Sequence, residues 1–283
     1  MRDRGAFAGF IESVDEARRK LALPRRDQIC FFRGHSNSQY KLLPSLFRVP
    51  RELRPGERRE DAYRKLETRL FFEFRGGARE LYTTDSTDWD VLFHMQHHGV
   101  PTRLLDWTSV FGVALYFALL NNRQKQSLSP CVWLLNPYAL NNATWPPRPG
   151  RPHRYRLYHP KYIAMNRLTN ESYDFGDLLL GIHPKRWGKQ RLSWKTPLAI
   201  YPYQRSERMY AQEGWFTIHG TNIAPLEVMF RQRPRILQRV DIPKEAIPGA
   251  RKFLADAGIG PRQLFPDLSG LADSIKERFD IPR

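Results

Sequence analysis

Long apolar runs, cysteines and acidic residues are all scarce in this sequence of 283 residues. A helix that crosses a membrane needs roughly 18 or more consecutive apolar residues. The longest apolar run, near Val110–Leu120, is too short for that. The N-terminal stretch contains acidic residues and has the pattern of an amphipathic helix rather than of a signal peptide. The sequence therefore predicts a protein without membrane contacts or a secretion signal.

The two cysteines, Cys30 and Cys131, each lie inside an apolar segment. A disulfide framework requires more cysteines and an oxidising compartment, so this pattern favours two buried free thiols. We therefore expect a protein of the reducing cytoplasm.

Acidic residues number 29 against 46 lysines and arginines, which gives a net charge of +17. Such an excess attracts polyanions, of which nucleic acid is the commonest in a cytoplasm. The excess is greatest between Arg148 and Lys195, where tyrosines and tryptophans alternate with basic residues. Basic side chains contact phosphates and aromatic rings stack on unpaired bases, although a solvated basic surface over a core of aromatics is the alternative. The nucleic-acid contacts that we expect are Arg151, Arg154, Tyr155, Arg156, Trp187 and Trp194.

Apolar residues make up 41% of the chain, enough for a sizeable core. Segments with helical spacing alternate irregularly with short apolar strands, which favours an α+β fold over a doubly wound one. We expect an N-terminal helix within residues 1–24 and one mixed domain over residues 25–283. Proline-rich residues open a basic, aromatic insertion or loop region at 141–195. Helices are expected at 6–23, 57–80, 89–98 and 205–212, and strands at 29–33, 131–136, 198–202 and 215–219.

The segment Gly99–Leu120 runs from a polar, charged stretch into a helix that is apolar on every face. We expect this helix to be buried and to begin at Thr108 or Ser109 as its N-cap. The preceding polar residues would then form a loop at the positive end of the helix dipole, where anions bind well. These loop residues are Thr102, Arg103, Asp106 and Trp107.

Two further polar clusters accompany this segment. Arg33 follows a short apolar strand, so we expect it to leave the core at the strand end, where Gly34 allows the backbone to turn. Gln212 and Glu213 lie between a predicted helix and a predicted strand, either exposed to solvent or facing the same cleft as Arg33.

His94, His97 and His98 have the spacing that brings two histidines to one helical face. This spacing suits zinc, but no third ligand of clear geometry lies nearby. We therefore expect no metal site, and we expect His97 to hydrogen-bond into the polar segment before the buried helix.

Several of these stretches together resemble the FRG domain family, which is named after a Phe-Arg-Gly motif. The resemblance covers residues 25–275, and RLLDWT is its most unusual motif. The matching stretches are FFRGHS, LLPSLFR, QHHGVPTRLLDWT, VALYFAL, AQEGWFTIHG and GIGPRQLFPDLSGLADSI.

The order of the clusters is also similar to the layout of the ADP-ribosyltransferases. That resemblance implies that Arg33 holds the phosphates of NAD, that Thr108 shapes the pocket for the nicotinamide ribose and that Glu213 holds the ribose. The transferase pattern has Glu two positions after Gln or Glu, where this chain has Gly214, so Glu213 or Asp106 would supply the acid. The cofactor site would also include Gly34, His35, Thr102, Arg103 and Trp107, and the catalytic site Gln212.

The function that we expect is an NAD-dependent ADP-ribosyltransferase-like enzyme, with NAD as substrate. Its target would be nucleic acid or a nucleic-acid-associated molecule, in a toxin or antiviral defence system directed against phage. A non-catalytic nucleic-acid-binding module is the alternative. A metal-dependent nuclease is a third reading, with His94 and either His97 or His98 as ligands.

Overall fold

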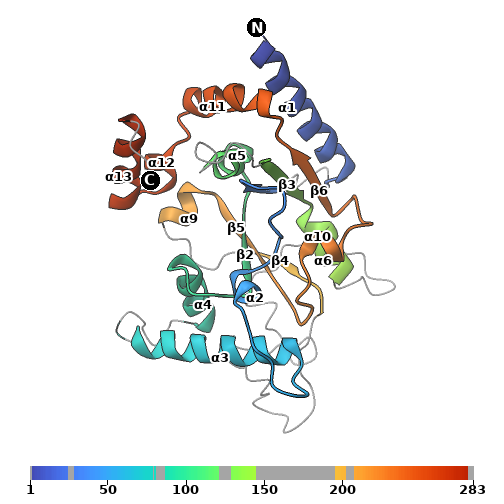
Figure 1. Ribbon diagram of the computed structural model, residues 1–283, viewed down its shortest axis with the longest axis vertical. Helices are drawn as coiled ribbons and strands as arrows, with labels where there is room; N and C mark the ends of the chain where they lie inside the picture. The colour runs from blue at the N-terminus through green and yellow to red at the C-terminus, as the bar shows by residue number, and fades with distance from the viewer. Residues whose placement is uncertain are drawn as a thin grey trace.

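The computed structural model describes residues 2–24, 29–78, 80, 87–120, 129–144, 195–201 and 207–279. All six residues expected to contact nucleic acid lie outside these ranges, as does most of the expected insertion at 141–195. Figure 1 shows how the elements of the described residues are arranged.

A six-stranded sheet with the strand order β4-β5-β2-β1-β3-β6 forms the centre of the molecule. Every neighbouring pair of strands is antiparallel, and helices and strands mix along the chain. The chain is therefore an α+β protein, as the sequence predicts. The strands are β1 (Phe31–His35), β2 (Leu104–Thr108), β3 (Cys131–Leu135), β4 (Leu198–Ile200), β5 (Gly214–Ile218) and β6 (Leu237–Asp241).

The two central strands, β1 and β2, are joined at a single register pair, Phe32 with Thr108. By contrast, β1 pairs with β3 over five residues, and β2 pairs with β5 over five residues. The sheet therefore consists of two three-stranded halves, β4-β5-β2 and β1-β3-β6, which part on one side of that pair.

One half of the sheet is covered by α1 (Arg2–Lys20), α5 (Phe111–Leu119) and α11 (Ile247–Asp256), which lie together in Figure 1. Helix α5 is almost entirely buried, as its all-apolar sequence predicts. It crosses β1 so closely that a Cβ atom on Gly34 would lie 1.9 Å from the carbonyl oxygen of Ala114. Gly34 lies within β1, and its lack of a side chain allows α5 to pack closely against the strand. The expected role of this glycine in a chain turn was therefore wrong.

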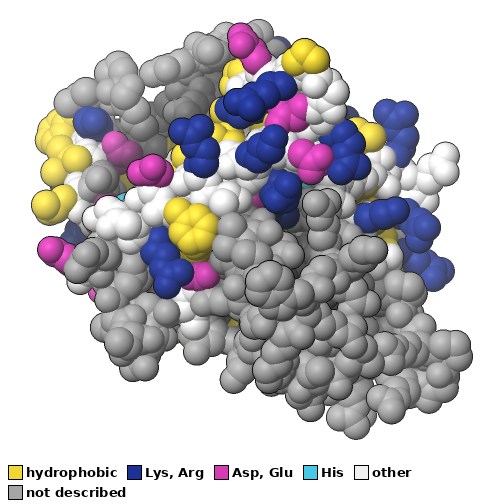
Figure 2. Space-filling model, turned by 90° about the horizontal axis from the view of Figure 1, so that it is seen from below, with side chains coloured by type: hydrophobic (Ala, Val, Ile, Leu, Met, Phe, Trp, Pro, Cys, Tyr) yellow, Lys and Arg dark blue, Asp and Glu magenta, His cyan; other side chains and the backbone are white. Residues whose placement is uncertain are grey.

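The other half of the sheet is covered by α3 (Arg59–Gly77) and α4 (Asp88–His97) on the same face. Helix α4 begins with a capping box in which Thr87 and Asp90 bind each other's backbone nitrogens. On the face that includes α3, basic and acidic side chains are interspersed (Figure 2). Ion pairs such as Lys65 with Glu57, at 2.7 Å, balance part of this charge locally.

The opposite face of the sheet packs against α6 (Pro137–Thr144) and α10 (Leu226–Met229) through a cluster rich in tryptophan. Shorter elements complete the described chain. These are α2 (Ser45–Arg48), α9 (Glu207–Ala211), the 3-10 helix η2 (Lys244–Ala246), α12 (Pro261–Leu264) and α13 (Leu268–Arg278).

The fold corrects two expectations about the segment 99–120. Residues Leu104–Thr108 form a central strand rather than a loop, and α5 begins after Val110, which makes no side-chain capping bond. β2 forms because all five of its residues pair with β5. Thr108 instead accepts a hydrogen bond from the backbone nitrogen of Val110, at 3.0 Å, in the turn before the helix.

Cys30 and Cys131 are both free and buried, as expected. Burial raises the pKa of each thiol to about 12, so neither is a reactive thiolate at neutral pH. Among the described helices, none is long and apolar enough to span a membrane.

Candidate functional site

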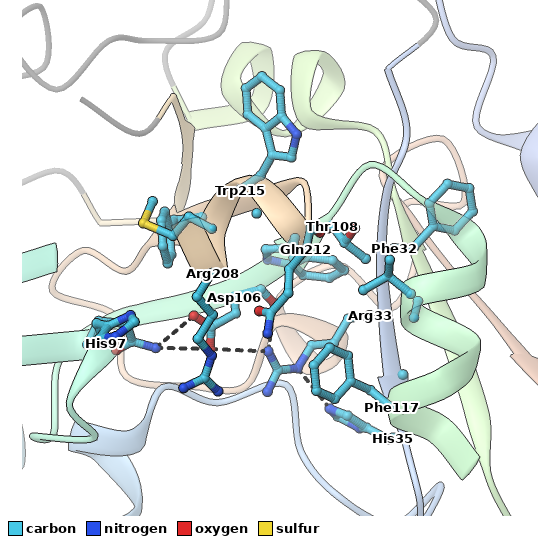
Figure 3. A pocket seen from close by; sticks show the side chains of 18 of the residues that line it. Phe32, Arg33, His35, His97, Asp106, Thr108, Phe117, Arg208, Gln212 and Trp215 are labelled. Carbon is cyan, nitrogen blue, oxygen red and sulfur yellow. Dashed lines mark hydrogen bonds and ion pairs between the residues drawn. The ribbon is translucent and has the colours of Figure 1, made fainter. Parts of the chain in front are cut away.

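A cavity of about 540 Å³ opens where β1 and β2 part. Helices α4 and α5 and the α9–β5 turn form its walls, so it lies between the two groups of helices on that face. Figure 3 shows the side chains converging on it. The residues expected at the site that do line this cavity are Arg33, Gly34, His35, Asp106, Trp107, Thr108 and Gln212.

Arg33 bridges the two halves of the sheet at the opening between β1 and β2. Its Nη1 donates to the backbone oxygen of Asp106 at 2.6 Å and lies 3.7 Å from Oδ2 of the same residue. Its Nε donates to Nε2 of His35 at 3.1 Å. Burial lowers the pKa of Arg33, but arginine titrates so far above neutrality that the guanidinium stays charged.

His35 is a buried partner that fixes the direction of the Arg33 side chain. Burial, and then the charge of Arg33, lower the pKa of His35 to about 3. The imidazole is therefore neutral at physiological pH, so its Nε2 can accept the hydrogen bond from Arg33. The two hydrogen bonds of Arg33 use its Nε and Nη1. Its Nη2 has no hydrogen-bond partner among the described residues and is available to a ligand.

Asp106 is the one carboxylate among the described residues that line the cavity. Nε2 of Gln96 donates to its two carboxylate oxygens at 3.0 and 2.9 Å. The hydroxyl of Thr102 donates to Oε1 of Gln96 and accepts from the backbone nitrogen of Leu104. Because Thr102 thus fixes which end of the Gln96 amide faces Asp106, the carboxylate has a set orientation although its side chain is 56% exposed.

The cavity carries more positive than negative charge. Besides Arg33, its lining includes Lys41, Arg48 and Arg208, against the single carboxylate of Asp106. Burial and the charge of Arg208 also lower the pKa of His97, another lining residue, which favours its neutral form. A site of this kind favours a ligand that carries several negative charges.

Thr108 and Gln212 connect the cavity walls. The hydroxyl of Thr108 donates to the backbone oxygen of Gln212 at 2.7 Å, and the amide of Gln212 donates to the backbone oxygen of Leu264 at 3.0 Å. The end of β2, the α9–β5 turn and α12 are therefore held together. Trp107 anchors β2 from the other face, where its Nε1 donates to Oγ1 of Thr217.

Three residues that we expected at the site are not among those that line the cavity. Arg103 forms an ion pair with the fully buried Glu67 of α3 and donates to the backbone oxygen of His219 at 3.2 Å. Thr102 is buried and acts through Gln96. Glu213 adopts a left-handed conformation, with φ of 44°, in the turn before β5. The carboxylate at the cavity is thus Asp106 and not Glu213.

The described residues include no group of three histidine, cysteine or acidic side chains placed to hold a metal ion. His97 and His98 contact each other ring to ring, with centroids 4.9 Å apart. The side chain that hydrogen-bonds into β2 is Gln96, the residue before His97. Within the motif QHHGVPTRLLDW, the glutamine and not a histidine makes the hydrogen bond to β2. Helical spacing alone does not show which of these neighbouring side chains makes that contact.

The residues that sequence reasoning missed are Gln96, Arg48 and Arg208. Gln96 had a signal, because it lies in the same motif as Asp106. Arg48 also had one, because it ends the stretch LLPSLFR, whereas Arg208 had none and reaches the cavity only through the packing of a distant segment.

No curated protein and no solved structure gives a significant match to the chain. A family model does match, and it covers β1, α4, β2 and α5, and thus Arg33, Gln96 and Asp106. That model is the FRG domain, and it matches residues 28–127, so this part of the chain is an FRG domain.

Proposed function

We propose that the cavity binds NAD and that the protein is an ADP-ribosyltransferase-like enzyme. The observation that carries this proposal is one oriented carboxylate, Asp106, beside an arginine in a cation-rich cavity of about 540 Å³. The phosphates of NAD match the arginine, and the carboxylate matches the positive charge that forms on the ribose when nicotinamide leaves.

In the proposed reaction the bond between the ribose C1′ and the nicotinamide nitrogen breaks, and neutral nicotinamide leaves with the electron pair. The ribose becomes an oxocarbenium-like cation, which Asp106 stabilises. A nucleophile of the acceptor then bonds to C1′ and loses its proton. The residues of this chain contribute positioning and electrostatic stabilisation, which together supply most of the rate enhancement in such mechanisms.

The acceptor that we propose is nucleic acid or a molecule bound to it. The support for this is the net charge of +17, since an excess of this size attracts polyanions. Phosphate contacts of the acceptor would use basic residues outside the cavity, so that NAD and the acceptor do not compete for Arg33.

The test incubates the full chain with NAD labelled in the adenylate part, in the presence of single-stranded and duplex oligonucleotides. We expect nicotinamide release and label on the oligonucleotide. Arg33→Lys retains the charge but loses the planar fork, so we expect it to lose nearly as much activity as Arg33→Ala without a change in fold. The exposed Arg262 of α12 does not line the cavity, and Arg262→Lys is the matched control.

The outcomes separate the candidate functions. Wild-type protein that neither releases nicotinamide nor labels any acceptor, yet binds oligonucleotides, would be a non-catalytic binding module. Cleavage of the oligonucleotide that a chelator stops would identify a nuclease. Full activity of Arg33→Ala would remove Arg33 from the site.

A further inference from the structure

The cavity holds more unpaired positive charge than one phosphate requires. Arg48 and Arg208 both line it, and neither forms an ion pair within the described part of the chain. Arg33 has the exposed Asp106 as its carboxylate partner, but at 3.7 Å. Like charges that converge on one cavity repel each other unless a multivalent anion neutralises them.

Arg208 enters the cavity from α9, the helix opposite α5. In Figure 3 its guanidinium and that of Arg33 point toward the same end of the cavity. The two arginines come from opposite halves of the sheet, because α9 leads into β5 while Arg33 belongs to β1. A ligand that contacts both must therefore span the opening between the halves.

Phe265 holds Arg208 in this direction. The guanidinium carbon of Arg208 lies 4.6 Å from the centre of the Phe265 ring, and that ring packs edge-on against Phe117 of α5. A guanidinium stacked on a ring by its face keeps the N–H groups of its edge free to donate. The stacking thus orients Arg208 without using its hydrogen-bond donors.

We propose that Arg208, oriented by Phe265, is a second phosphate-binding residue that acts with Arg33 to select ligands containing a diphosphate. This inference rests on the proposed function, because it names the part of NAD that the site recognises. Each guanidinium edge matches one phosphate of the diphosphate, whereas a nucleoside monophosphate engages one arginine and leaves the other without an anion. The site therefore favours dinucleotides and ADP-ribose over mononucleotides.

The experiment measures binding of ADP-ribose, AMP and adenosine to the full chain by calorimetry at one fixed ionic strength. We expect wild-type protein to bind ADP-ribose more tightly than AMP, and AMP more tightly than adenosine. Arg208→Gln should weaken ADP-ribose binding by about tenfold to a hundredfold, the value of one or two charge-assisted hydrogen bonds, and should reduce the preference for ADP-ribose over AMP.

Two further variants and one control sharpen this result. Phe265→Leu removes the ring but keeps an apolar side chain, and we expect it to weaken ADP-ribose binding by less than Arg208→Gln does. Arg208→Lys should fall between wild type and Arg208→Gln, because it retains the charge alone. Arg262→Gln, which removes a charge from the neighbouring α12, should bind all three ligands as wild type does.

The inference is overturned if Arg208→Gln binds ADP-ribose as wild type does, if it weakens AMP and ADP-ribose equally, or if wild type binds neither. A different result would contradict the proposed enzymatic activity alone. In that case ADP-ribose binds selectively, Arg208→Gln loses that selectivity, and wild-type protein releases no nicotinamide from NAD.

Discussion

Arg33 and Arg103 lie near the same strand, β2, in regions built from the same kinds of group. Each arginine has a carboxylate partner, Asp106 for Arg33 and Glu67 for Arg103. Each also lies near a buried histidine. Burial, and then the charge of its arginine, lower the pKa of His35 and of His219 alike to about 3.

The difference lies in the carboxylates. The side chain of Glu67 is fully buried and binds Arg103 through both of its oxygens, so the arginine has no donor to spare for a ligand on that side. The side chain of Asp106 is 56% exposed and faces a cavity, and Nη2 of Arg33 stays free. We therefore expect Arg33 rather than Arg103 to bind a ligand, because the carboxylate partner of Arg33 leaves part of its guanidinium unsatisfied.

The largest effect that we expect is a loss of stability in the Arg103 region. Arg103→Met leaves Glu67 buried without a partner, which costs about 3–5 kcal/mol in the free energy of unfolding. Arg33→Met loses the hydrogen bonds to His35 and to the backbone of Asp106 but leaves no buried charge, and should cost less, about 1–3 kcal/mol. Unfolding in urea measures both.

The double variant Arg103→Met with Glu67→Leu is the control for this comparison. It replaces the buried ion pair by apolar side chains and should recover most of the lost stability. Equal losses in Arg103→Met and Arg33→Met would contradict the distinction between a structural and a ligand-binding arginine.

The next effect concerns turnover in the Arg33 region. Asp106→Asn removes the negative charge but keeps the shape and the ability to accept from Gln96, so we expect NAD turnover to fall by about 10²–10³-fold. The melting temperature should change little, because Asp106 is exposed. Glu213→Gln is the matched control and should retain turnover, since Glu213 does not line the cavity. A loss confined to Glu213→Gln would return the catalytic role to that residue.

The dependence of the free energy of unfolding on pH should reflect the protonation of His35 and His219. In the folded protein both have a pKa of about 3, against about 6.5 in the unfolded chain. Between these values the unfolded chain takes up protons that the folded protein does not. The free energy of unfolding therefore does not depend on these histidines above about pH 6.5. It decreases as the pH falls from there toward 3, by about 1.4 kcal/mol per pH unit for each histidine.

His219→Phe separates the two regions in this measurement. Neither ring nitrogen of His219 has a hydrogen-bond partner among the described residues, and its ring packs against Phe47, so phenylalanine suits the site. The slope of unfolding free energy against pH should become shallower by about one histidine's share, while ADP-ribose binding stays unchanged. An unchanged slope would show that His219 does not titrate in this window.

Much of the fold could be predicted from the sequence, because its signals are local. The all-apolar composition of α5 predicts its burial, and helical spacing predicts α3 and α4. β6 was not predicted, because the arginine and glutamine in LQRVD interrupt the apolar pattern of a strand whose partner is β3. Local signals do not predict β2, because its strand character comes from pairing with β5, more than 100 residues away along the chain.

The candidate site, like the fold, could be predicted from the sequence only where the signal is local. The sequence motifs correctly bring Arg33, Asp106 and Gln212 to one cavity. The separation of Arg103 from that cavity depends on Glu67, which lies 36 residues earlier on α3 and carries no sign of burial in its sequence context. Roles that depend on a tertiary partner cannot be deduced from the motif alone.

The smallest effect that we expect tests how the Arg33 region orients its carboxylate. Thr102→Val removes the hydroxyl that donates to Gln96 and accepts from the nitrogen of Leu104. The Gln96 amide is then free to rotate, so Asp106 is less well placed, and we expect turnover to fall by about tenfold, a loss of roughly one hydrogen bond. The KM for NAD should change little, because Arg33 is untouched, and Thr102→Ser should restore turnover.

Thr217→Val is the matched control for that variant. Thr217 is fully buried like Thr102, and its hydroxyl accepts from Nε1 of Trp107 on the opposite face of β2. Both valine variants lose a buried hydrogen bond and should lose similar stability, about 1–3 kcal/mol. Only Thr102→Val should lower turnover, because only Thr102 contacts Gln96. Equal turnover in the two variants would mean that Gln96 needs no help from Thr102 to hold Asp106.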